Sequence, residues 1–287
     1  MKNSDTKPPF KWTGGKNRMR EQYSNIFSPS KDIDTFVDMF CGATSISLWI
    51  AHNYPNANII LNDSNSELMS MYGSIKNDWK NMEPYYRNLV NTWVALTVED
   101  RKKYYYELRE KYCHEHTSFA EFENNAMLYF MLKVNFNGMW KAYHKCNNRY
   151  STPPGTCTQK AGFFSVDEDN KFKQFIDKVT LNSGDFANLG NYAGKGTYYY
   201  ADPPYRDSVV QYQGGFDDVE QVRLANFLKS MGQAGSWFSE SNKDIGDGFW
   251  SKNFPQNSYN IHEVTAKYTA GRGTSVIDVK EVLITNF

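Results

Sequence analysis

The segment Asp202-Pro203-Pro204-Tyr205 could hold an exocyclic amine. It follows the apolar, aromatic run 197–201, which predicts a strand, and open α/β sheets bind ligands at the carboxyl ends of their strands. The prolines fix the backbone and lack N–H donors, which leaves carbonyls free to accept hydrogen bonds. The Asp202 carboxylate and a proline carbonyl could accept both amine hydrogens while Tyr205 stacks on the ring, so that the amine exposes its lone pair. The alternative is an ordinary proline-rich turn.

A second pattern predicts a nucleoside site on the same sheet. The run from Asp38 to Gly42 is an apolar strand that ends in a glycine turn, where the backbone can approach a ligand closely. The next predicted strand, 58–61, leads to Asp63, which lies 21 residues after Gly42. That spacing suits a carboxylate that binds ribose hydroxyls. Alone this pair fits any nucleotide-binding fold, and the tetrapeptide at 202–205 makes it specific.

The elements that must position these residues alternate between strand and helix at both ends of the chain. A helix is predicted over 43–52, and further strands at 179–181, 196–201, 236–239, 260–266 and 279–285. Residues 66–136 follow helical spacing, with an N-terminal cap at Thr97, and 135–158 reads as loops or a hairpin. We therefore predict a doubly wound α/β sheet formed by residues 1–65 and 166–287, interrupted by a mainly helical lobe at 66–165.

Composition and charge limit the possible classes of protein. The 287 residues are 40% hydrophobic and 22% charged, as in ordinary soluble proteins, and no apolar run approaches a membrane span. The polar start is no signal peptide, which predicts a cytoplasmic protein, and the four cysteines lack the spacing of a zinc site, so no metal is expected.

The net charge is zero, but the basic side chains are unevenly distributed. No acidic residue lies between Glu123 and Asp167. That stretch holds Lys133, Lys141, Lys145, Arg149 and Lys160, and the first twenty residues hold Lys2, Lys7, Lys11, Lys16, Arg18 and Arg20. Two basic regions on a neutral protein favour a local site for a polyanion, with a solvated basic surface as the alternative.

Together with the tetrapeptide, six motifs in family order make the chain resemble the DNA adenine methyltransferase (Dam) family of bacteria and T4-like phages. Segments 10–16, 38–45, 62–63 and 182–186 resemble its cofactor motifs, and 137–141 and 151–155 resemble its target-recognition elements. The resemblance implies a Rossmann-like sheet that binds S-adenosylmethionine, with a DNA-recognition lobe at 66–165. The implied cofactor-binding residues are Trp12, Lys16, Phe40, Gly42, Asp63, Phe186 and Asp202, and the implied catalytic residues are Asp202, Pro203 and Tyr205.

The resemblance also implies a DNA surface. Double-stranded DNA is the expected partner, with no membrane and no obligate protein partner, in the cytoplasm of a bacterial host cell. The expected DNA-binding residues are Lys11, Asn137, Met139, Lys141, Arg149 and Pro153, with Lys141 reading a base and Lys11 a second candidate at the other lobe. The sequence departs from the family twice, because Thr44 replaces a glycine that is frequent in the cofactor loop and Lys141 stands where arginine is usual.

The predicted function is site-specific methylation of adenine N6, at GATC or a related site, with base flipping. Lysine reads guanine with less geometric definition than arginine does, which predicts relaxed recognition. Cytosine N4 remains chemically possible, because its amine fits the same acceptors. An rRNA or protein-glutamine methyltransferase is a second possibility, although the related motif of those enzymes begins with Asn where this chain has Asp202. A catalytically dead DNA-binding homologue is a third, and the intact Asp202, Trp12 and Lys16 favour an active enzyme over it.

Overall fold

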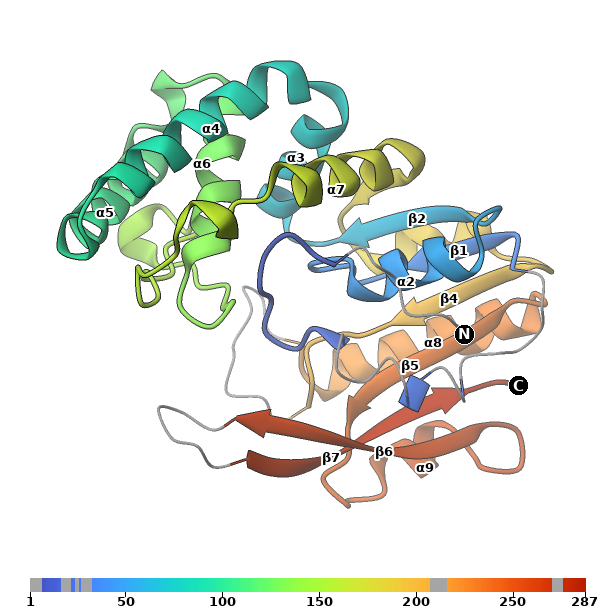
Figure 1. Ribbon diagram of the computed structural model, residues 1–287. Helices are drawn as coiled ribbons and strands as arrows, with labels where there is room; N and C mark the ends of the chain where they lie inside the picture. The colour runs from blue at the N-terminus through green and yellow to red at the C-terminus, as the bar shows by residue number, and fades with distance from the viewer. Residues whose placement is uncertain (1–6, 17–21, 24–25, 27–32, 207–215, 270–275) are drawn as a thin grey trace.

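The computed structural model describes residues 7–16, 22–23, 26, 33–206, 216–269 and 276–287. Its centre is a seven-stranded sheet of order β3-β2-β1-β4-β5-β7-β6 (Figure 1). The strands are β1 (Thr35–Asp38), β2 (Asn58–Asp63), β3 (Thr180–Ser183), β4 (Thr197–Ala201), β5 (Trp237–Lys243), β6 (Asn260–Thr269) and β7 (Val276–Thr285). The first five are parallel, and β7 runs antiparallel between β5 and β6. This topology confirms the predicted α/β class.

Helices cover both faces of the sheet because the strands alternate their buried side chains between two hydrophobic clusters. Phe36 of β1 faces the cluster that contains α2 (Ser45–Asn53), whereas its neighbour Val37 faces the cluster formed with α8 (Asp218–Gln233). Tyr198 and Tyr199 of β4 divide in the same way. The short helix α9 (Phe249–Asn253) joins the α8 side. The sheet is therefore buried on both sides, which holds the ends of its strands in fixed positions.

A set of helices lies between β2 and β3 and forms the upper part of the molecule in Figure 1. They are α3 (Ser66–Asn77), α4 (Trp79–Ala95), α5 (Val98–His114), α6 (Glu121–Val134) and α7 (Val166–Lys178). Asp169 of α7 forms ion pairs with Arg87 of α4 and Lys133 of α6, at 2.8 and 2.5 Å. The lobe limits 66 and 165 stay a prediction, and these pairs tie α7, just beyond the second limit, to the lobe helices.

The structure corrects two local predictions. The helix predicted from Ala43 begins at Ser45, because Thr44 adopts a left-handed conformation, with φ at 61°. The stretch predicted as a basic surface includes Lys133, but the side chain of this lysine is fully buried and paired with Asp169. The predicted cap is confirmed, since Thr97 Oγ1 accepts a hydrogen bond from the Asp100 amide at 3.2 Å.

None of the helices within the described ranges combines the length and the apolar character that crossing a membrane requires.

Candidate active site

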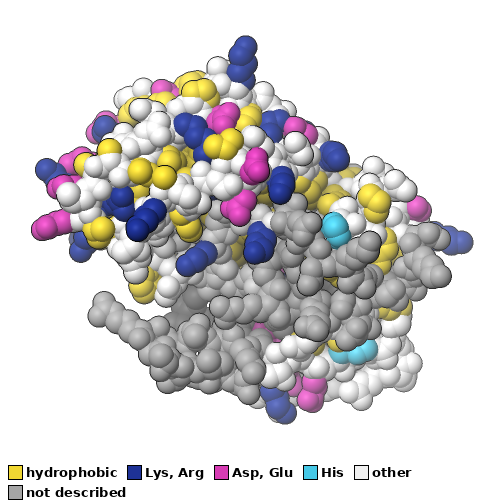
Figure 2. Space-filling model, in the orientation of Figure 1, with side chains coloured by type: hydrophobic (Ala, Val, Ile, Leu, Met, Phe, Trp, Pro, Cys, Tyr) yellow, Lys and Arg dark blue, Asp and Glu magenta, His cyan; other side chains and the backbone are white. Residues whose placement is uncertain are grey.

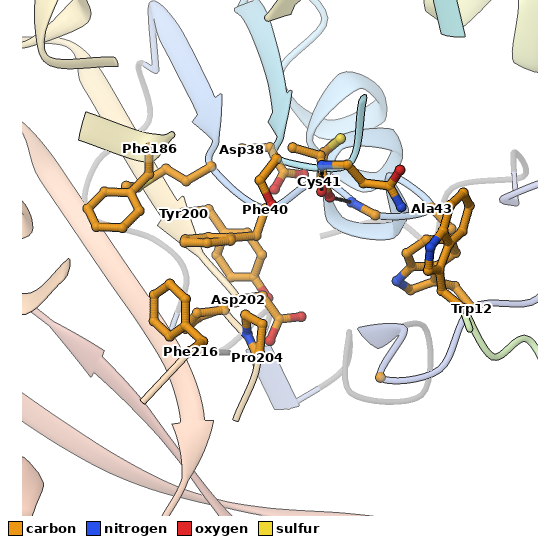
Figure 3. A pocket seen from close by; sticks show the side chains of 18 of the residues that line it. Trp12, Asp38, Phe40, Cys41, Ala43, Phe186, Tyr200, Asp202, Pro204 and Phe216 are labelled. Carbon is orange, nitrogen blue, oxygen red and sulfur yellow. Dashed lines mark hydrogen bonds between the residues drawn. The ribbon is translucent and has the colours of Figure 1, made fainter. Parts of the chain in front are cut away.

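A cavity of about 630 Å³ lies at the carboxyl ends of the parallel strands. It brings together all nine residues predicted to bind the cofactor or act in catalysis: Trp12, Lys16, Phe40, Gly42, Asp63, Phe186, Asp202, Pro203 and Tyr205. Figure 3 shows Phe40, Phe186 and Phe216 at one end and Trp12 at the other, with Asp38 and Asp202 between them. The volume suits a small organic ligand.

The glycine loop after β1 leaves no space for a side chain at Gly42. Its φ is 44°, and an added Cβ would lie 2.7 Å from the Trp12 indole nitrogen. The Asp63 carboxylate accepts hydrogen bonds from the backbone amides of Gly42 and Asn65, both at 3.0 Å. Burial raises the pKa of Asp63, and these backbone hydrogen bonds partly oppose that rise. Asp63 therefore fixes the loop in addition to its predicted contact with ribose.

Three phenylalanines form the apolar end of the cavity. The rings of Phe40 and Phe186 have centroids 5.8 Å apart, and Phe216 meets Phe40 edge-on at 5.6 Å. The Arg223 guanidinium lies 4.1 Å from the centroid of the Phe186 ring and donates to both oxygens of Asp185. Flat aromatic walls with polar groups beside them can hold a planar heterocycle.

Asp38 places a carboxylate in the middle of the cavity wall. Its Oδ2 accepts a hydrogen bond from Ser47 at 2.5 Å, whereas its buried Oδ1 has no hydrogen-bond partner among the described residues. Burial raises the pKa of Asp38 to about 7, helped by the nearby Asp202 and Asp63 and opposed by the Ser47 hydrogen bond. An unpaired buried carboxylate oxygen is costly, so it suits a cationic ligand group.

Asp202 is held by a buried lysine. Lys16 Nζ lies 2.9 Å from Asp202 Oδ1 and 4.5 Å from the centroid of the Tyr205 ring. Burial raises the pKa of Asp202 to about 6, against the lowering effect of Lys16, while Glu281 contributes a further rise. The Tyr205 hydroxyl lies 2.8 Å from both Ser241 Oγ and Glu281 Oε2.

Two buried amides fix the backbone around Tyr205. Gln221 Nε2 donates to the Pro204 carbonyl at 2.9 Å, and Asn242 Oδ1 accepts from the Arg206 amide at 3.2 Å. The two amides are joined to each other at 3.1 Å. Because Gln221 already donates to the Pro204 carbonyl, the carbonyl of Pro203 is the one better placed to accept from a bound amine.

The loop after α6 carries the predicted recognition residues at the border of the cavity. Trp140 lines the cavity, and Met139 and Lys141 flank it. Thr152 Oγ1 donates to the Met139 carbonyl at 2.9 Å and accepts from the Lys141 amide at 3.0 Å. The Lys141 carbonyl accepts from the Ser151 amide at 2.8 Å. The loop backbone is thus held firmly, while the Lys141 side chain is only half-buried.

Lys11 lies beside this loop, although the sequence predicts it at the other lobe. An added Cβ on Gly138 would lie 2.6 Å from the Lys11 carbonyl carbon, and the Thr13 amide donates to the Gly138 carbonyl at 2.9 Å. Lys11 and Asn137 are exposed, and Pro153 is half-buried. Figure 2 shows Lys and Arg side chains along the border of the helical part that faces the sheet. In the predicted basic N-terminal region, Lys2, Arg18 and Arg20 lie outside the described residues.

Two basic residues behave differently from a solvated basic surface. Lys16 is 2% exposed and belongs to the cavity wall. The guanidinium of Arg149 lies 4.3 Å from the centroid of the Tyr112 ring, and the Tyr112 hydroxyl donates to Glu67 at 2.5 Å. Glu67 also lines the cavity, so Tyr112 links Arg149 to a residue of the cavity wall.

Sequence reasoning did not assign site roles to Asp38, Trp140, Phe216 or Glu281. Asp38 and Trp140 lie inside recognised motifs, and a carboxylate or a tryptophan in such a motif is a candidate for contact with a ligand. Phe216 follows a stretch without a clear pattern, and Glu281 is one of several charged residues in its strand, beside Lys280. Only the antiparallel pairing of β7 with β5 brings Glu281 to Tyr205.

Comparison with known proteins gives the family. A family model described as D12 class N6 adenine-specific DNA methyltransferase matches residues 12–270. The type II methyltransferase M.MjaIII of Methanocaldococcus jannaschii is 27% identical over 99% of this chain and 100% of its own length. M1.LlaDCHI of Lactococcus lactis is 27% identical over 100% of this chain and 98% of its own length.

A DNA adenine methylase of Haemophilus influenzae is 25% identical, covering 78% of this chain and 75% of that protein. The solved precorrin-6y methyltransferase of Geobacter metallireducens covers 96% of this chain and 91% of its own, with a TM-score of 0.42 and 10% identity, too weak a likeness for an argument. The family match spans most of the chain and includes the whole described cavity. The chain therefore belongs to the D12 class of N6 adenine-specific DNA methyltransferases.

Proposed function

We propose that this protein methylates adenine N6 at a specific site in double-stranded DNA, with S-adenosylmethionine as methyl donor. The observation that carries the proposal is the position of Asp202, between an aromatic end and a glycine loop in one cavity. Family membership supports adenine-specific DNA methylation. The recognition site, base flipping and the role of each residue are our inferences.

The residues of the cavity fit S-adenosylmethionine. Phe40, Phe186 and Phe216 offer aromatic walls for its adenine, and Asp63 lies at the end of β2, where a ribose-binding carboxylate is expected. The partnerless Asp38 Oδ1 fits the ammonium of the methionine part. Gly42, with Trp12 packed against it, allows a close approach of the ligand to the backbone.

The protein's part in the reaction is to position the target amine. In the transfer, the N6 lone pair bonds to the sulfonium methyl carbon, the carbon–sulfur bond breaks with its electron pair remaining on sulfur, and N6 loses one proton. Asp202 and the Pro203 carbonyl accept the two amine hydrogens, which directs the lone pair away from them. Tyr205, anchored through its hydroxyl, stacks on the base. Asp202 takes up the released proton and then returns it to solvent.

We infer base flipping, because an adenine stacked within a duplex cannot bring N6 to Asp202 in the cavity. Lys141 and Lys11, on neighbouring backbone segments, are placed to contact DNA at the border of the cavity. We infer that Lys141 reads a base, with Asn137, Met139, Arg149 and Pro153 completing the DNA surface. The site is GATC or a relative of it, read with less stringency than by arginine.

Expression in a host that lacks DNA methylation tests the proposal. Long-read modification sequencing should find N6-methyladenine in one sequence context, GATC or a related one, and none in cells with the empty vector. Modified cytosine in place of adenine would contradict the adenine assignment. An unmodified genome, despite tight binding of S-adenosylmethionine in a titration, would indicate an enzyme of another substrate class. A protein that neither methylates DNA nor binds S-adenosylmethionine would be a catalytically dead homologue.

A further inference from the structure

One oxygen of the catalytic carboxylate is already paired in this structure. Lys16 Nζ lies 2.9 Å from Asp202 Oδ1, so the ammonium neutralises the carboxylate and weakens it as an acceptor for the target amine. Lys16 is 2% exposed, and a buried ammonium that loses its anion carries a high free-energy penalty. Asp202 can be released as a full-strength acceptor at low cost only if Lys16 has another anion to move to.

Glu281 is that anion. Its side chain is fully buried on β7, and its Oε2 lies 3.9 Å from Lys16 Nζ. Because the ammonium lies at 2.9 Å from Asp202 and 3.9 Å from Glu281, a shift of about 1 Å would exchange the closer partner. Nζ also donates to the Gly14 carbonyl at 3.2 Å, which tethers the ammonium between the two carboxylates, and the Tyr205 ring lies 4.5 Å from it.

A chain of hydroxyls holds Glu281 in place. The Tyr205 hydroxyl donates to Glu281 Oε2 at 2.8 Å, so its oxygen accepts from Ser241, which lies at 2.8 Å. Ser241 in turn accepts from the Tyr23 hydroxyl at 2.7 Å. Each donor in the chain points toward Glu281, which favours its ionised form as a fixed second anion.

We propose that Glu281 is a positioning residue that takes Lys16 from Asp202 when the target amine arrives. This inference rests on the proposed function. In the free enzyme Lys16 neutralises Asp202, and in the complex with DNA it pairs with Glu281 and leaves Asp202 to the amine. The lysine thereby keeps an anionic partner throughout, and the carboxylate is not left buried and unpaired before substrate binds.

The first test is Glu281→Gln, which keeps the shape and an acceptor for Tyr205 but removes the charge. Lys16 then has no second anion and stays on Asp202. The single-turnover rate at saturating S-adenosylmethionine and DNA should fall by roughly tenfold or more, the scale of a lost charge-assisted contact. Affinity for S-adenosylhomocysteine and the thermal midpoint should stay close to wild type, which separates positioning from folding.

A double-mutant cycle with Lys16→Met tests whether Glu281 acts through Lys16. Without the lysine there is nothing to transfer, so Glu281→Gln should have little further effect on the rate in that background. Glu107→Gln serves as the matched control, because it makes the same change on an exposed carboxylate of α5 that pairs with Lys103. Its effect and that of Lys16→Met should simply add.

The pH dependence of kcat/KM tests the charge of Glu281, because a purely structural role of this residue would leave that dependence unchanged. The groups that face Asp202 are Lys16, Tyr205 and Glu281, with Tyr200 and Asp38 nearby. Glu281 raises the pKa of Asp202, so Glu281→Gln should move the acidic limb of kcat/KM to lower pH, and Lys16→Met should move it to higher pH.

Three results would overturn the inference while leaving the proposed function intact. They are an unchanged rate in Glu281→Gln, an undiminished effect of that change in the Lys16→Met background, and an acidic limb that does not move. The wild-type enzyme in the same assay separates the two proposals. If it forms no N6-methyladenine, the proposed function fails and takes this inference with it.

Discussion

The catalytic end of the cavity and the recognition loop hold their charged side chains in opposite ways. Lys16 and Glu281 are buried and paired around Asp202, in contact with Tyr205. Lys141 has a tightly bonded backbone, through Thr152 and Ser151, but a side chain that is only half-buried. Chemistry needs charged groups that are paired inside the protein before the substrate arrives, whereas base reading needs a fixed backbone and a side chain that can meet the DNA.

The difference has a practical consequence. A change at the catalytic end alters several coupled groups at once, so its effects should be large and non-additive. A change of the Lys141 side chain alters one half-buried group, so its effects should be smaller and confined to DNA preference.

Asp202→Ala should have the largest effect. It removes the carboxylate that positions the amine, and methyl transfer should fall by roughly 10²–10³-fold or more, as when one preorganised polar contact is lost. Asp177→Ala, which removes an exposed carboxylate on α7, is the control and should act like wild type. Near-normal turnover of Asp202→Ala, measured with duplex DNA, would remove Asp202 from the catalytic centre.

Asp63→Ala should come next. The change removes a carboxylate that we assign to ribose and that also accepts the Gly42 and Asn65 amides. Affinity for S-adenosylmethionine should fall by about 1–3 kcal/mol, the scale of lost hydrogen bonds to a charged group. Calorimetry gives the value, and a Kd equal to that of wild type would place the ribose elsewhere.

Lys141→Ala should relax preference at one base pair, by about 1–3 kcal/mol of discrimination if Lys141 reads that base. Lys160→Ala, in the same acid-free stretch, should affect all sequences alike or not at all. Lys141→Arg should gain stringency for GATC. A mismatch panel measures all three, with Lys11→Ala as the second candidate. If site preference does not change in Lys141→Ala, Lys141 is not the base-reading residue.

Thr44→Gly should have the smallest effect and should stabilise the protein. Thr44 has a φ of 61°, which disfavours β-branched residues, and its buried hydroxyl has no hydrogen-bond partner among the described residues. Removing the strained conformation and the unbonded hydroxyl should stabilise the protein by more than the loss of the buried methyl group destabilises it. The free energy of unfolding should therefore rise by about 1 kcal/mol. Thr97→Ala is the opposite control, because it removes a helix cap and should lower stability. A lower thermal midpoint for Thr44→Gly would show that packing dominates.

Local patterns were enough to predict the strands and the run of helices between them, whereas the places of Trp12, Lys16 and Phe186 came from the family resemblance. Parallel strands bring their carboxyl ends to one edge, so Asp38, Asp63 and Asp202 had to lie near one another once the strands were recognised. Helix spacing and the Thr97 cap likewise depend only on neighbours in the chain.

Features that depend on long-range pairing could not be predicted in this way. Glu281 reaches the site through an antiparallel strand that no local pattern specifies, and Lys133 is buried because α7 supplies Asp169. Lys11 lies beside Gly138 because of a backbone contact across 127 residues of sequence. Charge counts in the sequence cannot separate such buried, paired lysines from those on a surface.

The most direct test uses S-adenosylmethionine labelled on its methyl group, duplex DNA and mass analysis of the released nucleosides. Wild-type protein should place the label on N6-methyladenine, and Asp202→Ala should place almost none while still binding S-adenosylhomocysteine. Label on N4-methylcytosine, or equal amounts of N6-methyladenine from both proteins, would contradict adenine methylation centred on Asp202.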